Sequence, residues 1–266
     1  MKKQKESALS NTKIAIVFFI LLVFIVGISL TVKVITVLKN GQFDSSKRFT
    51  LTIANGKNIE VMSLSPDLKE IVVFKLNDNV NLVEAGRFLE IPIDGFIVQN
   101  SLDLNQKVDS LFVKTILNYN KLKTNLTIID LLKLTMLARA IPESSVNVKM
   151  VGDANGLELD KVVGRLANDT SIEKDHQTIR IINGTEVIGL GNRLARLITN
   201  MGGNVIIVVT SDSLMKKSVI LHIDEKTYTV KRLQKVLGYE VAREENNAIS
   251  DITIVIGEDK VKNLAF

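Results

Sequence analysis

The sequence predicts an α/β protein with an N-terminal transmembrane helix, a mixed α+β domain and a small two-layer α/β sandwich as its C-terminal domain. Three observations support this prediction. An uninterrupted apolar run occupies residues 14–32, and residues 49–168 show strand-like alternation followed by helical periodicity. Over residues 178–260, short aliphatic strands alternate with amphipathic helices, which is the pattern of a sheet covered by helices.

The apolar run at residues 14–32 contains no charged residue in 19 positions. As a helix it would be roughly 28 Å long, close to the hydrocarbon thickness of a bilayer. A buried core helix of this length would carry polar residues on one face, and a cleaved signal peptide would have a shorter apolar region followed by small residues. We therefore expect an uncleaved signal-anchor over residues 13–38.

Basic residues flank the run on both sides, which weakens but does not remove the orientation signal. Only Glu6 opposes the four lysines that precede the run, which are Lys2, Lys3, Lys5 and Lys13. Because lysine-rich flanks tend to stay in the cytoplasm, we expect residues 1–12 to form a cytoplasmic tail. The protein would then cross the cytoplasmic (inner) membrane once, N-terminus inside. A linker at residues 39–48 would lead to two extracytoplasmic domains.

The positive net charge of the chain is concentrated around the anchor. Residues 1–48 contain eight of the 34 Lys and Arg but two of the 29 Asp and Glu, so residues 49–266 contain 26 basic and 27 acidic residues. The membrane is the expected partner of the basic flanks, because anionic headgroups attract them. The remainder lacks a basic stripe interleaved with aromatic residues, so no nucleic-acid partner is expected. The chain has no Cys, and therefore no disulfide braces either domain.

The first domain, residues 49–168, is predicted to begin with strands and to continue with helices. Period-two alternation and turn signals predict strands at residues 49–53, 59–64, 71–74 and 91–98. Helical patterns follow at residues 108–117, 128–141 and 157–166. Thr127 is expected to cap the second of these helices together with Asp130, and Pro142 to end it. A polar stretch at residues 169–177 is expected to be a linker.

The second domain, residues 178–260, alternates between strands and helices. Strands are expected at residues 179–182, 205–209, 218–223 and 252–256, and helices at residues 187–201 and 226–237. Gly202 and Gly203 are expected to end the first of these helices.

The second domain opens with IRIINGTEVIGLGNRLARLITNMGG at residues 179–203 and closes with TIVIGED at residues 253–259. These two segments resemble those of the LytR C-terminal domain, and the resemblance covers about residues 178–260. In that family, the domain follows the catalytic domain of LytR-CpsA-Psr cell-envelope proteins, and it also occurs on anchored proteins without it. The resemblance implies a bacterial cell-envelope protein.

Residues 49–150 show a fainter resemblance to a shortened, degenerate LytR-CpsA-Psr domain. The similar segments are VMSLSP at 61–66, IVVF at 71–74, IPIDGF at 91–96 and residues 127–139. Members of that family transfer a phosphate-linked polymer from a lipid pyrophosphate carrier to peptidoglycan, which requires arginines, carboxylates and Mg²⁺. Where catalytic members carry a Ser-Ile-Pro-Arg-Asp-like stretch, this chain reads Lys75-Leu76-Asn77-Asp78-Asn79.

The arginines that this chemistry needs are missing from that stretch. Between residues 49 and 150 the only arginines are Arg87 and Arg139. Lys75, Asp78 and Arg87 are either a remnant of the site or part of a solvated loop, and we favour the loop. We therefore expect no catalytic residue, no cofactor and no enzymatic activity, but a non-catalytic binding or scaffold role in cell-wall maintenance. A cell-wall polymer or another envelope protein would be the partner. The alternative is a divergent phosphotransferase with an unrecognised site.

Three glycines follow the first strand of the second domain, and two of them have the G-x4-G spacing of a phosphate-binding loop. However, Leu190 and Gly191 occupy the positions where such a loop needs Lys and Ser or Thr. We therefore expect a structural segment, with Asn183 and Gly184 in a turn, Gly184 at positive φ, and Gly189 and Gly191 in close helix–sheet packing.

The remaining polar candidates are two histidines and a basic helix face. His176 lies in the expected linker and His222 in a strand, and because neither accompanies a cluster of Cys or carboxylates, no metal site is expected. In the last expected helix, one face carries four basic residues, which are Lys226, Lys231, Arg232 and Lys235. Such a face is usually only solvated, but it is the candidate for binding an anionic wall polymer.

Overall fold

The computed structural model describes residues 2–56, 58–76, 80–82, 84–100, 102–151, 163–164, 167–223, 225–244 and 249–263. The chain divides into two compact units, Met1–Gly41 and Gln42–Phe266. The second unit contains two β-sheets with separate hydrophobic cores.

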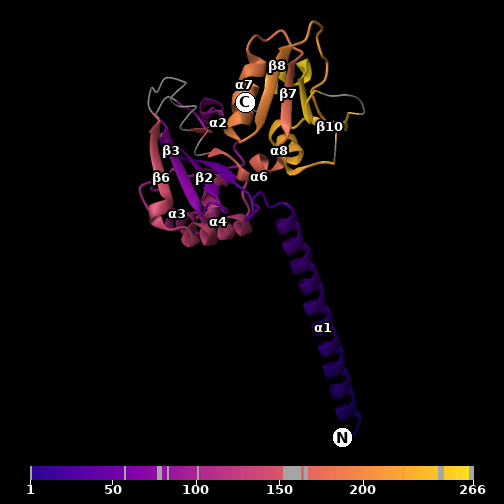
Figure 1. The fold of residues 1–266 in the computed structure, drawn as a ribbon. Helices are drawn as coiled ribbons and strands as arrows, with labels where there is room; N and C mark the ends of the chain where they lie inside the picture. Colours follow the sequence, from indigo (N-terminus) through magenta and orange to yellow (C-terminus); the bar gives the residue numbers. More distant parts are fainter. Residues whose placement is uncertain are drawn as a thin grey trace. The chain divides into compact units, whose positions relative to one another are not determined.

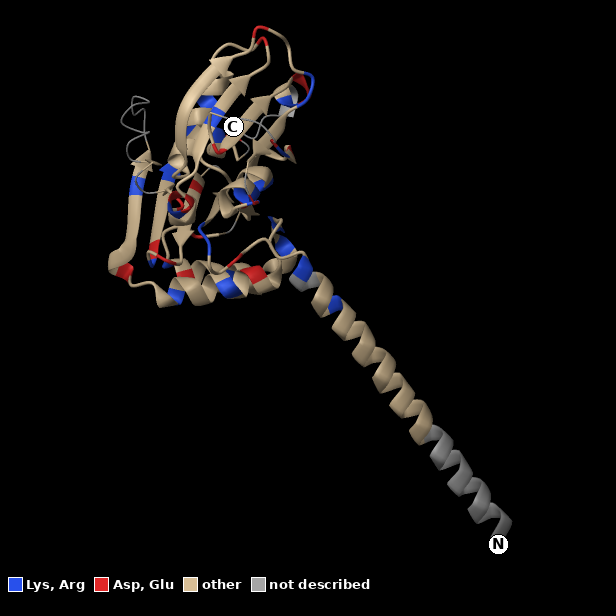
Figure 2. Cartoon of the chain, turned by 45° about the vertical axis from the view of Figure 1, so that its right-hand side comes forward, with Lys and Arg blue, Asp and Glu red and all other residues tan. Residues whose placement is uncertain are grey.

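The first unit is one helix, α1 (Lys2–Lys39). Within it, Ile16–Thr36 is a candidate membrane span of 21 residues with a mean hydropathy of 2.7, and none of its residues is buried by protein. The hydroxyls of Thr31 and Thr36 donate to backbone carbonyls four residues earlier, both at 2.8 Å, so they need no outside partner. In Figure 2, α1 is free of charged residues over most of its described length. A single apolar helix is therefore present where the anchor was expected.

The first domain is built on a six-stranded mixed sheet in the order β5-β4-β1-β2-β3-β6. Its strands are β1 (Phe49–Asn55), β2 (Asn58–Ser65), β3 (Glu70–Leu76), β4 (Gly95–Val98), β5 (Lys123–Thr124) and β6 (Val146–Val151). β2 pairs antiparallel with β1 and β3, whereas β4 is parallel to β1 and β6 is parallel to β3. All four predicted strands are present. The last begins at Gly95 rather than at residue 91, in keeping with Pro92, which has no amide to donate to a ladder.

Helices lie on both faces of this sheet (Figure 1). One core joins the sheet to α3 (Val108–Leu117) and α4 (Ile128–Ala140). A second core on the opposite face contains the short helix α2 (Ala85–Leu89). The predicted capping box is present, because Thr127 and Asp130 each accept the other's backbone amide. Two short 3₁₀ turns occupy Tyr119–Lys121 and Glu143–Ser145. The helix predicted at 157–166 lies almost entirely outside the described residues.

The C-terminal domain contains a five-stranded sheet in the order β10-β9-β11-β7-β8. The strands are β7 (Thr178–Asn183), β8 (Asn204–Thr210), β9 (Val219–His222), β10 (Glu240–Arg243) and β11 (Ile252–Ile256). β7 is parallel to β8 and β11, β9 is antiparallel to β11, and β10 is parallel to β9. A 3₁₀ helix follows at Glu258–Asn263. The four predicted strands are present, and β10 is additional.

Three helices share one core with this sheet, so the predicted two-layer arrangement is confirmed. They are α6 (Thr170–Asp175), α7 (Leu190–Asn200) and α8 (Tyr228–Leu237). α7 begins three residues later than predicted because Gly189, at φ 80°, occupies its N-cap. α8 begins after Thr227, whose side chain accepts the Val230 amide.

Two segments expected to be linkers are instead parts of the folded domains. Phe43 is buried in the first core and packs edge-on against Phe49, with ring centroids 5.2 Å apart. Residues 170–175 form α6, whose Ile172 is buried in the second core. In each polar stretch a single apolar residue is sufficient to bind the segment to a core. The segments predicted as linkers at 39–48 and 169–177 therefore each contribute a buried residue to a core.

Candidate functional site

A hollow lies on the face of the first sheet that α3 and α4 cover. Its apolar part has a volume of about 360 Å³, with Met62 and Val73 from the strands and Leu111 and Ala138 from the helices in its wall. A more polar part, of about 560 Å³, adjoins it. The two parts meet at four residues that line both, which are Glu60, Lys75, Leu104 and Asn105.

An ion pair between neighbouring strands marks this meeting point. Glu60 in β2 is paired in register with Lys75 in β3, and both lie on the same face of the sheet as Met62 and Val73, which pack against α3 and α4. The Lys75 Nζ lies 3.2 Å from the Glu60 carboxylate and donates to Asn105 Oδ1 at 3.1 Å. Burial raises the pKa of Glu60 above its ordinary value, although the hydrogen bond and charge of Lys75 oppose the rise. Glu60 is thus an acid held in an environment that disfavours its charge.

The rim of the apolar part is polar. Lys107 forms an ion pair with Glu143, and Asp109, which also lines the hollow, lies 3.6 Å from Arg139. Both amide atoms of Gln106, a lining residue, are buried without a protein hydrogen-bond partner among the described residues. Because a buried amide without a partner is costly, it is available to hydrogen-bond a bound molecule.

The charges around the hollow are mostly negative. Among the described lining residues, the acids Glu60, Asp103, Asp109 and Glu143 outnumber Lys75 and Lys107, and no arginine is present. The described residues also contain no group of three or more His, Asp or Glu that could hold a metal ion. This arrangement can enclose an apolar group and hydrogen-bond a polar one, but it offers no cation cluster for a pyrophosphate.

Three residues were considered as a catalytic remnant, and the two that the structure describes come from opposite sides of the first sheet. Lys75 lines the hollow on the α3 and α4 face. Arg87 belongs to α2, whose buried residues pack in the core on the opposite face of the sheet. Asp78 lies outside the described residues. Arg139, the other arginine of this region, has a side chain 63% exposed on α4.

The basic helix face predicted in the C-terminal domain needs a correction at Arg232. Lys231 and Lys235 are exposed, and Lys226 donates to Gln234 Oε1 at 2.7 Å. Arg232 instead points inward, with only 8% of its side chain exposed, and forms an ion pair with Asp94. Its position in α8 places it towards the first domain, which one helix considered alone cannot reveal. A polymer-binding role for the three lysines stays a prediction.

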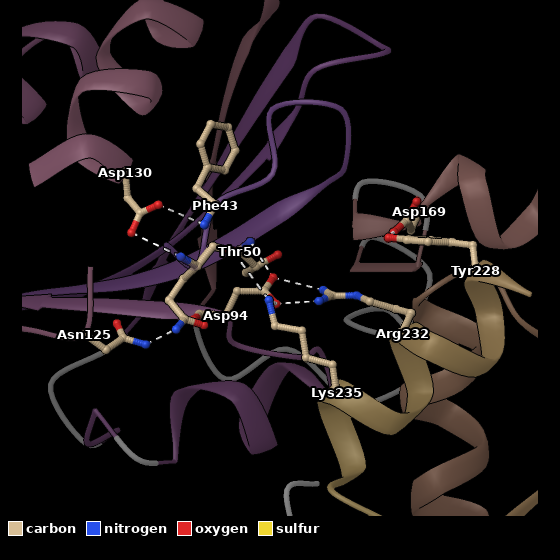
Figure 3. A network of polar contacts seen from close by, with 10 residues as sticks. Phe43, Thr50, Asp94, Asn125, Asp130, Asp169, Tyr228, Arg232 and Lys235 are labelled. Atoms are coloured by element: carbon tan, nitrogen blue, oxygen red, sulfur yellow. Dashed lines mark hydrogen bonds and ion pairs between the residues drawn. The ribbon is translucent and has the colours of Figure 1, made fainter. Parts of the chain in front are cut away.

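This ion pair joins the two domains (Figure 3). Both terminal nitrogens of Arg232 donate to the Asp94 carboxylate: Nη1 donates to Oδ1, and Nη2 donates to Oδ2 at 2.9 Å. The Asp94 side chain is only 3% exposed. Burial alone would lower the pKa of Arg232, but Asp94 raises it above its ordinary value, so the guanidinium stays charged. Asp94 also accepts the Thr50 amide at 3.1 Å. The sequence signal for Asp94 was a lone charge inside an apolar run, which requires a partner when buried.

Further contacts support the same junction. Arg196 of α7 donates twice to the Glu90 carboxylate, at 2.6 Å to each oxygen, and Asn200 donates to the Glu90 carbonyl at 3.1 Å. Within the C-terminal domain, the Tyr228 hydroxyl donates to Asp169 at 2.6 Å, and burial together with this bond raises the pKa of Tyr228. The two domains are therefore held together by direct polar contacts between protein groups.

The segment that follows the anchor reaches both domains. The amides of Gln42 and Phe43 both donate to the Asp130 carboxylate at 3.1 Å, which fixes the segment to the start of α4. Further along, Lys47 Nζ lies 4.2 Å from the centroid of the Tyr228 ring in α8. This segment thus contributes to the junction between the two domains.

In the glycine-rich loop of the C-terminal domain, two of the three glycines have other roles than predicted. Gly184 is not at positive φ; a Cβ there would contact the Met215 side chain and lie 3.0 Å from the Ile256 carbonyl oxygen. Gly189 has the positive φ, at 80°, and open space around it. Gly191 does pack closely, since a Cβ would lie 2.8 Å from Val208 Cγ1.

The remaining polar candidates of this domain have local roles. The Asn183 side chain accepts the Thr185 amide at 3.2 Å and donates to the Val187 carbonyl at 2.9 Å, and so organises the turn. His176 caps α6 with φ 50°, and His222 lies in β9. No phosphate-binding loop geometry involving a lysine is formed in this turn, whose residues are all described.

Comparisons with known proteins identify one region of the chain. The family model described as LytR cell envelope-related transcriptional attenuator, LytR_C, matches residues 176–259. A comparison with curated proteins found no match.

Solved structures with similar parts include three bacterial proteins. The transcriptional regulator yvhJ from Bacillus subtilis is 12% identical, with 44% of this chain and 94% of that chain covered and a TM-score of 0.36. For the Lin1025 protein from Listeria innocua the identity is 11%, the coverages are 46% and 97%, and the TM-score is 0.34. B. subtilis TagV is 12% identical, with 44% of this chain and 94% of that chain covered and a TM-score of 0.31. At these TM-scores the likenesses carry no argument about this chain. The family match at residues 176–259, in contrast, confirms that the C-terminal domain resembles the LytR C-terminal family.

Proposed function

We propose that this chain is a membrane-anchored, extracytoplasmic protein of the bacterial cell envelope, with a non-catalytic binding or scaffold role in cell-wall maintenance. The candidate span Ile16–Thr36 and the LytR_C match at residues 176–259 support the envelope setting. The lysine-rich N-terminal flank supports an N-terminus in the cytoplasm and both domains outside.

The observation that carries the non-catalytic part is the charge around the hollow. Transfer from a lipid pyrophosphate needs cations that stabilise the leaving group, and loss of one such group typically costs about 100- to 1000-fold in rate. The described lining contains four carboxylates, two lysines and no arginine, and each lysine is paired with one of those carboxylates. Such a site repels a pyrophosphate and suits a neutral, hydrogen-bonding ligand with an apolar portion.

The binding role is tested with the full chain in detergent and purified cell-wall sacculi. We expect the protein to sediment with the sacculi. Val148→Asp places a charge in the wall of the hollow, at a side chain that is 52% exposed, and should reduce binding. Lys149→Asp, at an exposed position in the same strand that does not line the hollow, is the matched control. Absence of sedimentation, or equal loss in both variants, would contradict binding through the hollow.

The absence of transferase activity is tested separately. The full chain, reconstituted in bilayers with a lipid pyrophosphate and Mg²⁺ or Mn²⁺, should release no product above background. Turnover that disappears in Lys75→Ala but persists in Arg87→Ala would overturn the proposal and indicate a phosphotransferase that uses the hollow.

The orientation is tested with a protease added to intact spheroplasts. Digestion of the second compact unit, Gln42–Phe266, is expected because the proposed orientation exposes it to the added protease. Protection of the C-terminal domain until the membrane is permeabilised would contradict an extracytoplasmic location.

A further inference from the structure

One face of α4 is apolar and exposed. Ile128, Leu132 and Met136 follow one another at intervals of four residues, and these residues are 43%, 49% and 72% exposed. On α3, which packs against α4, Leu117 is 78% exposed. The opposite face of α4 supplies the first core, so these residues are not needed to fill it.

The charges on the exposed face of α4 are all positive. Its remaining exposed residues are Lys133, Arg139 and Ala140. The single acid of the helix, Asp130, is fully buried. Nearby acids are Asp109, paired with Arg139, and Asp44, whose pKa is lowered mainly by the Ser46 amide and to a smaller extent by Lys133. An apolar stripe beside basic side chains is typical of helices that lie at a membrane–water interface, because anionic headgroups attract the basic residues.

Chain length keeps this helix close to the end of the candidate span. Five residues separate Thr36, where the span ends, from Gln42, so these two residues can lie at most about 20 Å apart. The Gln42 amide donates to Asp130, in the first turn of α4. The beginning of α4 is therefore tethered within a short reach of the bilayer surface.

We propose that the exposed face of α4 docks on an anionic lipid surface and thereby orients the second compact unit on its membrane. This docking rests on the membrane anchorage proposed above. Burial of Ile128, Leu132 and Met136 among the headgroups removes apolar surface from water. Because the tether makes contact with the bilayer effectively intramolecular, this small patch is sufficient for docking.

The lack of Cys in the chain allows a direct test. Single-cysteine full-length variants carrying a fluorophore are reconstituted in vesicles of phosphatidylglycerol and phosphatidylethanolamine, with or without doxyl-labelled lipid. The docking probe is Met136→Cys, and Ile25→Cys, within α1, reports on the anchor itself. Leu214→Cys, which is 53% exposed in the C-terminal domain, is the matched exposed apolar control. We expect quenching at positions 25 and 136, several-fold stronger than at position 214.

Each other outcome overturns a different statement. Quenching at position 25 alone overturns the docking and leaves the anchorage intact, whereas no quenching at position 25 overturns both. Equal quenching at 136 and 214 overturns the assignment to α4. Excimer emission between pyrene-labelled copies at position 136, in place of quenching by lipid, would assign the face to a second copy of the chain and overturn lipid docking.

A charge variant distinguishes docking from chance proximity. Leu132→Asp, introduced next to the probe at position 136, is expected to reduce the quenching several-fold. Asn120→Asp adds the same charge at an exposed residue outside the helix, and should leave it unchanged. Quenching that persists in the Leu132→Asp variant would overturn the proposal.

Discussion

Two of the ion pairs are made by an acid of the first domain, and protein surrounds them to different extents. One joins Glu60 to Lys75 in the hollow, and the other joins Asp94 to Arg232 at the domain junction. At the junction both side chains are almost fully buried, with 8% and 3% exposed. In the hollow, the acid is buried to a similar degree, but the Lys75 side chain remains 28% exposed.

The difference shows how one kind of contact can stabilise a fold or remain available to a ligand. Asp94 is bonded by both terminal nitrogens of Arg232 and by the Thr50 amide, so its oxygens have protein partners. The pair in the hollow borders a cavity of about 360 Å³ whose wall also contains the Gln106 amide, which has no hydrogen-bond partner among the described residues. The sealed pair is therefore structural, whereas the open pair borders the hollow that is proposed to bind a ligand.

The largest expected effect is that of Arg232→Met. Removing the guanidinium leaves the Asp94 carboxylate buried without its main partner, which typically costs about 3–5 kcal/mol. We expect the free energy of unfolding, measured by urea denaturation followed by circular dichroism, to fall by this amount.

Lys235→Met is the matched control on the same helix. Its Nζ lies 3.8 Å from Asp94, but its side chain is 48% exposed, so the loss should be below about 1 kcal/mol. Similar losses in both variants would show that burial does not distinguish the two contacts.

The regular elements near these pairs follow local rules, and the sequence predicts them well. The helix expected at 108–117 from its apolar spacing is α3, with the same limits. The Thr127–Asp130 capping box needs only residues three apart. The five-residue helix α2 and the four-residue strand β10 are too short for a periodic signal, and both were missed.

The sites depend on contacts that local patterns do not contain. Glu60 and Lys75 face each other across a hairpin, so counting the register would have paired them. Asp94 and Arg232 are 138 residues apart and lie in different domains. Arg232 therefore looked like one more solvated cation of its helix, and only the tertiary structure shows that it is buried.

At the hollow, Lys75→Met should have a smaller effect than the change at the junction. We expect a loss of about 1 kcal/mol, because the partly exposed Lys75 is already in contact with solvent. The pKa of Glu60, followed through its carboxyl resonance, should rise further without the opposing charge. Lys149→Met, at an exposed position of β6, is the control and should change neither quantity. A lowered pKa of Glu60 would contradict the ion pair.

Gln106→Leu tests whether the Gln106 amide lowers the stability of the fold while it contributes to binding in the hollow. Replacing a buried, unpartnered amide by an apolar side chain of similar size should stabilise the fold by up to about 1 kcal/mol. Sedimentation with sacculi should weaken in the same variant. Asn120→Leu, at an exposed position, should leave both measurements nearly unchanged. Lower stability together with unchanged binding would show that Gln106 is a structural residue.

The smallest expected effect is a change in pH dependence, seen in Glu60→Gln. Burial raises the pKa of Glu60 in the folded chain above its unfolded value near 4.5, so between these two values the folded state binds more protons than the unfolded state. The stability that this carboxyl contributes is complete below the unfolded pKa and is lost as the pH rises through the folded pKa. Since Gln does not titrate, the stability of Glu60→Gln relative to wild type should increase as the pH rises from about 4 to about 7. Urea denaturation at a series of pH values measures this difference. A constant difference would indicate an unshifted pKa of Glu60, and a decreasing one would indicate that the fold stabilises the charged form of the Glu60 carboxyl.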